Sequence, residues 1–209
     1  KSQPAKTGPS VSPWQHRHLV LGTIGIFVAV GAEVAIGSFL VNYLTQPDIG
    51  GMAPKAAAGF VSLYWAGAMI GRFAGSAVMQ RVPASIVLGT AAVVVLALLT
   101  TAILTSGSLS MRSMLLIGLF NSIMFPTIFT LGIAELGPLT SRGSGILMAA
   151  AVGGAIVPVL QGVIADAVGV HHSFILPAVC YLYVIFYGFH GSKPAGPLVA
   201  GPGKVPHSA

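Results

Sequence analysis

The chain has 209 residues, of which 55% are hydrophobic and only 7% are charged, and its mean hydropathy is +0.88. Soluble domains carry about 25% charged residues, so this composition excludes an ordinary soluble domain and indicates an all-α membrane protein with several spans. The formal net charge of +6 comes from ten scattered Lys and Arg residues, so no basic patch suggests a nucleic-acid partner. The single cysteine, Cys180, excludes a disulfide within the chain.

Six apolar segments are long enough to cross a bilayer, which takes roughly 20 apolar residues per helix. We expect these spans at residues 19–44, 56–80, 84–105, 113–135, 144–165 and 173–190. Together they predict one transmembrane bundle over residues 19–190. The two ends, residues 1–18 and 191–209, are rich in Pro, Gly and Ser and predict a linker and a flexible tail.

The Lys and Arg residues favour an orientation with both ends in the cytoplasm. In that orientation seven of them lie inside, while Lys55 and Arg112 lie outside and Arg72 falls within the second span. An excess of positive charge on the cytoplasmic side is the usual pattern, and an even number of spans agrees with it.

Polar residues are distributed unevenly over the six spans. The first and fourth spans are the most polar, the second and fifth are intermediate, and the third and sixth carry no amide or charge within their cores. This pattern predicts a weak internal repeat of three spans. Because three is odd, the second triplet is inverted relative to the first, and inverted repeats with polar, broken helices near the midplane are typical of transporters.

Glu33 lies in the apolar stretch GAEVAIGSFLVNYL, residues 31–44, about 3 Å from the middle of its span at 1.5 Å per residue. Gly22, Ala29 and Gly37 share its helical face, and a stripe of small residues faces protein rather than lipid. A charge there costs on the order of 3 kcal/mol. Glu33 is therefore either a ligand for substrate or a coupling ion, or a structural carboxylate paired with Arg72.

Three amides and one aromatic ring are further candidates for substrate binding. Asn121 and Phe125 are four residues apart, so a continuous helix would place them on one face. An amide can donate to and accept from sugar hydroxyls, and a ring packs on the apolar face of a pyranose. Gln161 offers a second amide, and Asn42 a third near the outer membrane interface. The alternative for these amides is hydrogen bonding between helices.

Four charged residues are predicted to have structural or gating roles. Arg72 lies within a double GxxxG motif, which lets another helix backbone approach closely. Arg81, Glu135 and Arg142 lie at predicted cytoplasmic ends of spans. We expect them to form salt bridges between helices that hold one gate closed and break when it opens.

The remaining motifs exclude several other functions. His171 and His172 have no carboxylate or thiol at ligand spacing, so we expect a loop, no metal site and no cofactor. Ser144 lies in RGSG, where an intramembrane serine protease would have GxSG, and no HExxH or Walker motif is present, so we expect no enzyme. Pro126 and Pro158 are expected to weaken the fourth and fifth spans.

Three stretches carry a resemblance to a known family: GAEVAIGSFLVNYL, IGRFAGSAVMQRV and FNSIMFPTIFTLGIAELGPLTSRGSGILMAAAVGGAIVPVLQGVIADAVG. Over roughly residues 19–190 the sequence resembles the C-terminal half of the fucose–galactose–glucose branch of the major facilitator superfamily. The stretch with Glu33 is more similar to glucose/galactose transporters than to fucose permeases, which tend to have a neutral amide at that position.

This resemblance implies a twelve-helix fold of two bundles, of which the chain would supply helices seven to twelve. It implies symport of a hexose with H⁺ or Na⁺ by alternating access, in a bacterial inner membrane, with an N-terminal six-helix half as partner. The acidic residues usually linked to proton coupling would lie in that other half. The alternatives are a transporter of another small solute and a half-size or non-transporting membrane subunit that dimerises.

Overall fold

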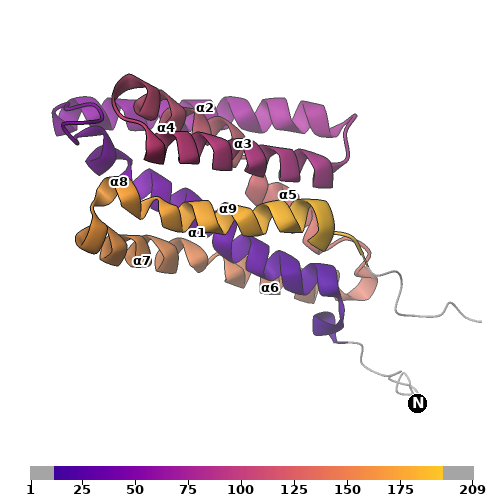
Figure 1. The fold of residues 1–209 in the computed structure, drawn as a ribbon. Helices are drawn as coiled ribbons and strands as arrows, with labels where there is room; N and C mark the ends of the chain where they lie inside the picture. The colour runs from indigo at the N-terminus through magenta and orange to yellow at the C-terminus, as the bar shows by residue number, and fades with distance from the viewer. Residues whose placement is uncertain (1–11, 195–209) are drawn as a thin grey trace, which may run out of the picture.

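The structure is a computed structural model and describes residues 12–194, which form helices and their connections without any strand (Figure 1). The elements are the 3₁₀ turn η1 (Pro13–Gln15), α1 (Arg17–Leu44), α2 (Pro54–Met79), α3 (Ala84–Leu104), α4 (Gly107–Asn121), α5 (Met124–Gly132), η2 (Gly137–Leu139), α6 (Thr140–Ala150), α7 (Gly153–Val168), α8 (Val170–Ser173), α9 (Ile175–Phe186) and the π-helical turn η3 (Tyr187–Gly191).

The six predicted spans are confirmed as six segments that run along one elongated bundle (Figure 1). Helices α1, α2 and α3 are uninterrupted, α4 and α5 form the fourth segment, α6 and α7 the fifth, and α8, α9 and η3 the sixth. Five of these segments are long and apolar enough to cross a membrane. The other one, α2, has the length, but its glycines and Arg72 lower its hydropathy.

The segment ends differ from the predicted ones where polar residues continue a helix beyond the apolar run. The fourth segment begins at Gly107 rather than at 113. Its first turns carry the exposed polar residues Ser108 and Arg112, which lie outside the apolar run. At the start of the chain, His16 is buried just before α1, and His18 is buried in the first turn of that helix. Residues 1–11 of the predicted linker and 195–209 of the predicted tail lie outside the described residues.

The packing partners of the helices follow the predicted repeat. The first helix of the first triplet, α1, packs against α7 and α9, which belong to the second and third spans of the other triplet. In the same way α4 packs against α2 and α3. Exchange of the two triplets therefore reproduces the main helix contacts, as expected for two related halves.

Glycines bring two of these helix pairs into backbone contact. A Cβ atom added at Gly71 of α2 would overlap the backbone of Leu119 in α4, and one added at Gly153 of α7 would overlap the backbone of Phe27 in α1. Small residues drive helix association in membranes because they allow this close approach. The predicted role of the GxxxG motif around Arg72 is thus visible in the α2–α4 contact.

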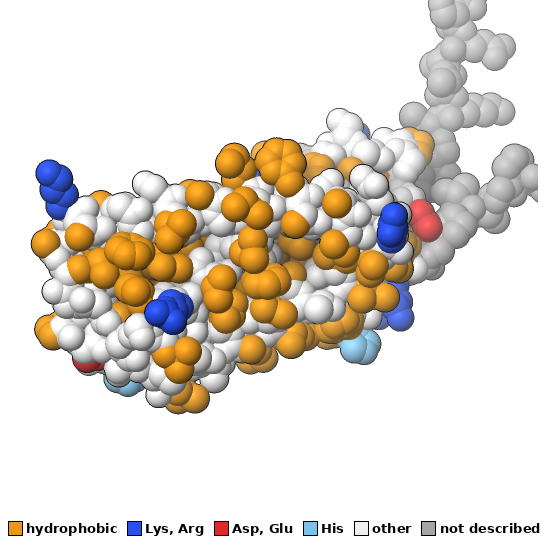
Figure 2. Space-filling model, turned by 90° about the horizontal axis from the view of Figure 1, so that it is seen from above, with side chains coloured by type: hydrophobic (Ala, Val, Ile, Leu, Met, Phe, Trp, Pro, Cys, Tyr) orange, Lys and Arg blue, Asp and Glu red, His pale blue; other side chains and the backbone are white. Residues whose placement is uncertain are grey.

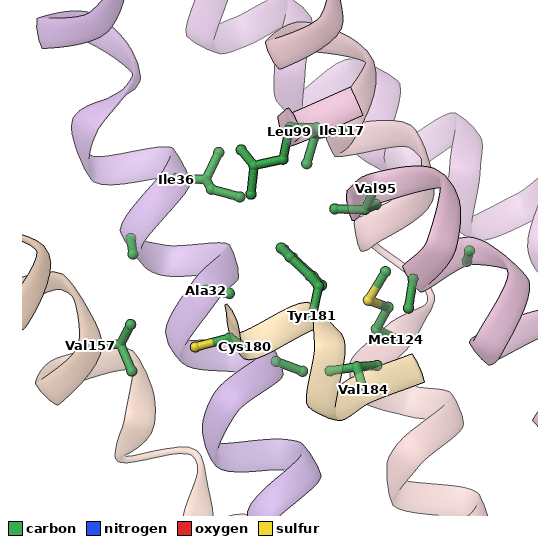
Figure 3. Packing of buried hydrophobic residues seen from close by; sticks show 14 of the residues in the cluster. Ala32, Ile36, Val95, Leu99, Ile117, Met124, Val157, Cys180, Tyr181 and Val184 are labelled. Carbon is green, nitrogen blue, oxygen red and sulfur yellow. The ribbon is translucent and has the colours of Figure 1, made fainter. Parts of the chain in front are cut away.

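Four tyrosines are among the largest fully buried side chains: Tyr43, Tyr64, Tyr181 and Tyr187. Figure 3 shows Tyr181 pointing from α9 into the centre of the core, towards Ala32 and Ile36 of α1 and Leu99 of α3. Buried tyrosine hydroxyls normally find a hydrogen-bond partner. Three of the four do so, and Tyr64 does not.

Replacement of Gly71 by alanine should destabilise the bundle, because the added methyl group has no space at the α2–α4 contact. Overpacking of this kind costs about 1–3 kcal/mol. The matched control is Gly59→Ala in the same helix, where a Cβ meets nothing within 4 Å, so the substitution should be neutral or slightly stabilising.

Both variants can be followed with a thiol-reactive dye during heating, because Cys180 is the chain's single cysteine and is buried. An unchanged unfolding midpoint for Gly71→Ala would contradict the close α2–α4 contact.

Candidate functional site

The fourth and fifth segments, the two expected to be weakened by proline, are broken near the middle, although Pro158 itself lies inside α7. Helix α4 ends at Asn121, a turn follows at Ser122 and Ile123, and α5 begins at Met124 with Pro126 in its first turn. Proline lacks the N–H that would continue the α-helical ladder. The break between α6 and α7 lies at Ala151 and Val152, one and a half turns before Pro158.

Asn121 is the last residue of α4 and is 1% exposed. The hydroxyl of Tyr181 on α9 donates a 3.0 Å hydrogen bond to its side-chain oxygen Oδ1. This bond fixes the amide so that its nitrogen points away from Tyr181, and Nδ2 has no partner in the protein. Asn121 thus presents two unused N–H donors inside the bundle.

Tyr64 of α2 lies beside Asn121 and is also 1% exposed. Its hydroxyl and the Asn121 amide are neighbours, but neither atom forms a hydrogen bond of acceptable geometry with the other or with any other described residue. The Tyr64 ring packs edge-on against Trp65, with ring centroids 5.4 Å apart. A second buried polar group therefore lacks a partner next to the first.

Glu33 of α1 is half-buried and lies about 4 Å from the middle of its helix. It is close enough for its charge to act on Tyr64 and Tyr181, and Arg72 is the cation whose charge acts on it. However, Glu33 and Arg72 do not form an ion pair, because the only ionic contact within 4.0 Å among residues 12–194 joins His171 and Asp48. Glu33 is therefore available to a ligand in this conformation.

These residues define what we call the polar cluster: Glu33, Tyr64, Asn121 and Tyr181, contributed by α1, α2, α4 and α9. It offers a carboxylate acceptor, an amide donor and a hydroxyl that can do both. Sequence reasoning identified Glu33 and Asn121 but missed the two tyrosines. A tyrosine in an apolar span was the available signal, since its hydroxyl needs a partner when buried.

The other predicted binding residues are distributed differently. Phe125 is half-buried and lies across the helix break from Asn121, so the four-residue spacing rule does not join them, and its ring neighbours Phe129 at 6.1 Å. Gln161 is fully buried and donates a 3.2 Å hydrogen bond to Ser173 of α8, while its side-chain oxygen has no partner. Asn42 is exposed near the end of α1.

The predicted salt bridges at the other end of the bundle are not formed in this conformation. Arg81, Glu135 and Arg142 are all exposed, and none has an ionic partner within 4.0 Å among the described residues. Glu135 adopts a φ of 57°, a left-handed conformation that is uncommon for residues other than glycine. Their gating role therefore stays a prediction.

A second group of polar contacts closes the opposite end of the bundle. The carbonyl oxygen of Ala102 in α3 accepts hydrogen bonds from Tyr43 at 3.1 Å and Ser110 at 2.7 Å, and lies 2.8 Å from Nε2 of His171. Nδ1 of His171 lies 3.6 Å from the Asp48 carboxylate. The prediction of a loop at His171 was wrong, because α8 carries this residue into the contact between α1, α3 and α4.

The comparisons with curated proteins return transporters. The chain is 56% identical over 182 residues to the glucose/galactose transporter of Brucella abortus, a match that covers 87% of the chain and 44% of the relative. It is 41% identical to a putative glucose/galactose transporter of Helicobacter pylori, covering 92% of the chain and 48% of the relative. It is 33% identical to the L-fucose-proton symporter of Escherichia coli, a match that covers 86% of the chain and 41% of the relative.

Solved structures agree with these relatives. The major facilitator superfamily transporter FucP, in the outward conformation, matches with a TM-score of 0.79 and 31% identity over 82% of this chain and 42% of that one. A peptide transporter with 18% identity and a TM-score of 0.74 shares the fold alone. No family model matches the chain.

The fold and these matches define the class: a multi-pass, six-helix membrane bundle with the fold of one half of a major facilitator superfamily transporter. Within that class, the chain matches the C-terminal half of proteins named glucose/galactose transporters. The chain spans about half the length of the curated relatives it matches.

Tyr43→Phe should loosen the contact around the Ala102 carbonyl, because it removes a buried hydroxyl that bonds both Ala102 and Ser110. Loss of a buried hydrogen-bond partner costs about 1–3 kcal/mol. The thermal midpoint of Cys180 labelling should fall accordingly. Tyr183→Phe is the matched control, since its hydroxyl is half-buried and donates a single bond to Leu21. Equal midpoints for Tyr43→Phe and the unmodified chain would contradict this assignment.

Proposed function

We propose that the chain supplies the C-terminal half of a sugar transporter that moves a hexose, with glucose and galactose as the expected substrates, by alternating access. The names of the relatives at 56% and 41% identity support this substrate class. The relatives named as fucose symporters are coupled to protons, which supports H⁺ as the coupling ion, whereas Na⁺ has no support among these names. The transporter uses no cofactor.

The observation that carries this proposal is the pair of unpartnered buried groups beside Glu33. Leaving a buried donor unpaired costs about 1–3 kcal/mol, so Asn121 Nδ2 and the Tyr64 hydroxyl favour a polar ligand. A hexose carries several hydroxyls that donate and accept, and it can bond the amide, the phenol and the carboxylate together. The carboxylate of Glu33, the amide of Asn121 and the hydroxyl of Tyr64 thus suit a ligand with several hydroxyl groups.

An aromatic surface for the sugar ring lies next to this cluster. The indole of Trp65 is partly exposed and lies 3.5 Å from the position of a Cβ built on Gly37, one helical turn from Glu33. Ligand sites combine a few placed polar groups with apolar and aromatic walls. Trp65 therefore suits packing against the C–H face of a pyranose better than Phe125, which the sequence favoured.

The proposed partner is the N-terminal six-helix half of the same transporter. Helix α2 exposes Met69, Ile70 and Phe73, and α7 exposes Val159 and Val163, each at 60% or more. Apolar side chains on two helices that flank Glu33 suit a protein interface as well as lipid. We place the assembled transporter in a bacterial inner membrane, with the ends of this chain in the cytoplasm.

Asn121→Ala should weaken hexose binding at least tenfold, because it removes the amide donor and leaves the Tyr181 hydroxyl without its acceptor. The measurement is the KM for exchange of labelled glucose by the assembled transporter in proteoliposomes without an ion gradient. Asn42→Ala, an exposed amide on α1, is the matched control and should leave the KM unchanged. An unchanged KM for Asn121→Ala would remove the polar cluster from the substrate site.

Glu33→Gln should alter the coupling of uptake to the proton gradient, because the amide keeps the shape of the side chain but cannot carry a proton. Downhill exchange of hexose should persist, while accumulation against a gradient should fall by tenfold or more. Asp166→Asn, an exposed carboxylate of α7, should leave accumulation intact. Full accumulation and unchanged ion dependence in Glu33→Gln would exclude a role for Glu33 in coupling.

A further inference from the structure

An apolar groove lies between α2 and α3, with α4 as its floor. It encloses a volume of about 330 Å³. Small residues of α2, such as Gly71, Ala74 and Gly75, form one wall, and branched residues of α3 form the other. Thr90 is the one residue with a polar side chain in the lining. A groove of this composition suits a hydrocarbon ligand.

The groove exists because α2 and α3 diverge although they are neighbours in sequence. The turn from Gln80 to Pro83 joins them directly, but each packs mainly on α4, and they touch each other little. The α2 side of the gap carries Gly71, in close contact with Leu119 of α4, and Gly75, in close contact with Ile123 in the turn after α4, so these positions have no side chain to fill the space. The opening is therefore built into the packing of α2 on α4.

The helices that form this groove carry basic charges and no acidic ones. No acidic residue occurs between positions 49 and 134, a stretch that includes α2, α3 and α4 and holds Lys55, Arg72, Arg81 and Arg112. Arg81 is exposed and directly precedes Val82, which lines the groove. Seen from above, this face of the bundle is largely apolar, with Lys and Arg side chains at both ends and within it, and an acidic side chain beside the basic one at the right-hand end (Figure 2).

We propose that the groove binds one acyl chain of an anionic membrane phospholipid, with the phosphate of that lipid held beside Arg81. An exposed cation next in sequence to a lining residue and a hydrocarbon-lined interior match the two chemical parts of such a lipid. Arg81 lies at the same end of the bundle as the start of α1, which is the cytoplasmic end in the proposed orientation. The cytoplasmic leaflet is where anionic lipids attract basic residues, by about 1 kcal/mol per residue. The proposal does not depend on the sugar site.

Native mass spectrometry of the full chain in detergent tests this lipid site, with dioleoyl phosphatidylglycerol and dioleoyl phosphatidylcholine as probes. The unmodified chain should bind phosphatidylglycerol about fivefold more tightly than phosphatidylcholine. Arg81→Gln should abolish that preference, whereas Arg112→Gln, which removes a cation remote from the groove, should keep it. Thr90→Phe fills the groove and should weaken binding of both lipids.

Thr100→Phe is the matched control for the groove, because Thr100 is also an exposed threonine of α3 but does not line the cavity. Cys180 labelling verifies that each variant is folded. Equal affinity of the unmodified chain for the two lipids would overturn the proposal. So would lipid binding to Thr90→Phe that equals binding to Thr100→Phe. If lipid binding is lost when the N-terminal half is co-purified, the groove is where that half packs and the lipid proposal is wrong.

Discussion

The backbone contact of α2 with α4 at Gly71 and Leu119 is the constraint on which the site depends. In a bilayer there is no hydrophobic drive between apolar helices, so close packing of small residues has to hold them together. Here that packing places Tyr64, two turns before Gly71 on α2, beside Asn121, half a turn after Leu119 on α4. The related contact of Gly153 with Phe27 fixes α7 against α1 in the other triplet. The same α2–α4 contact separates α2 from α3 and so leaves the apolar groove.

The polar cluster follows from helix ends and long-range partners rather than from one motif. Helix α4 ends at Asn121, where Pro126 prevents the helix from continuing unbroken. Tyr181, 60 residues later in the sequence, fixes the orientation of the amide. Glu33 approaches from α1 without an ion-pair partner. Polar groups left unpaired within a membrane are costly, which is why we propose that a ligand completes this arrangement.

The run lengths of apolar residues were sufficient to predict the six spans. Proline indicated which two segments are broken, but Pro158 lies inside α7 and does not mark the position of the second break. The sequence also indicated Glu33 and Asn121, because a charge or amide in an apolar run is conspicuous. A tyrosine in an apolar span signalled that Tyr64 and Tyr181 need polar partners, but not which ones, because those partners lie on distant segments. The break at Ser122 also invalidated the periodicity that joined Asn121 to Phe125, since a spacing rule holds only within one continuous helix. For His171, a short turn of helix and a distant carbonyl in α3 decide its position, and neither has a sequence signature.

The central claim is that this bundle forms half of a proton-coupled hexose transporter. Its most direct test is uptake of labelled glucose and galactose into proteoliposomes, with imposed proton or sodium gradients. The chain would be reconstituted with its N-terminal half and, in parallel, alone. The account predicts concentrative hexose uptake driven by the proton gradient only when both halves are present. Absence of hexose uptake from the assembled protein under either gradient would contradict it.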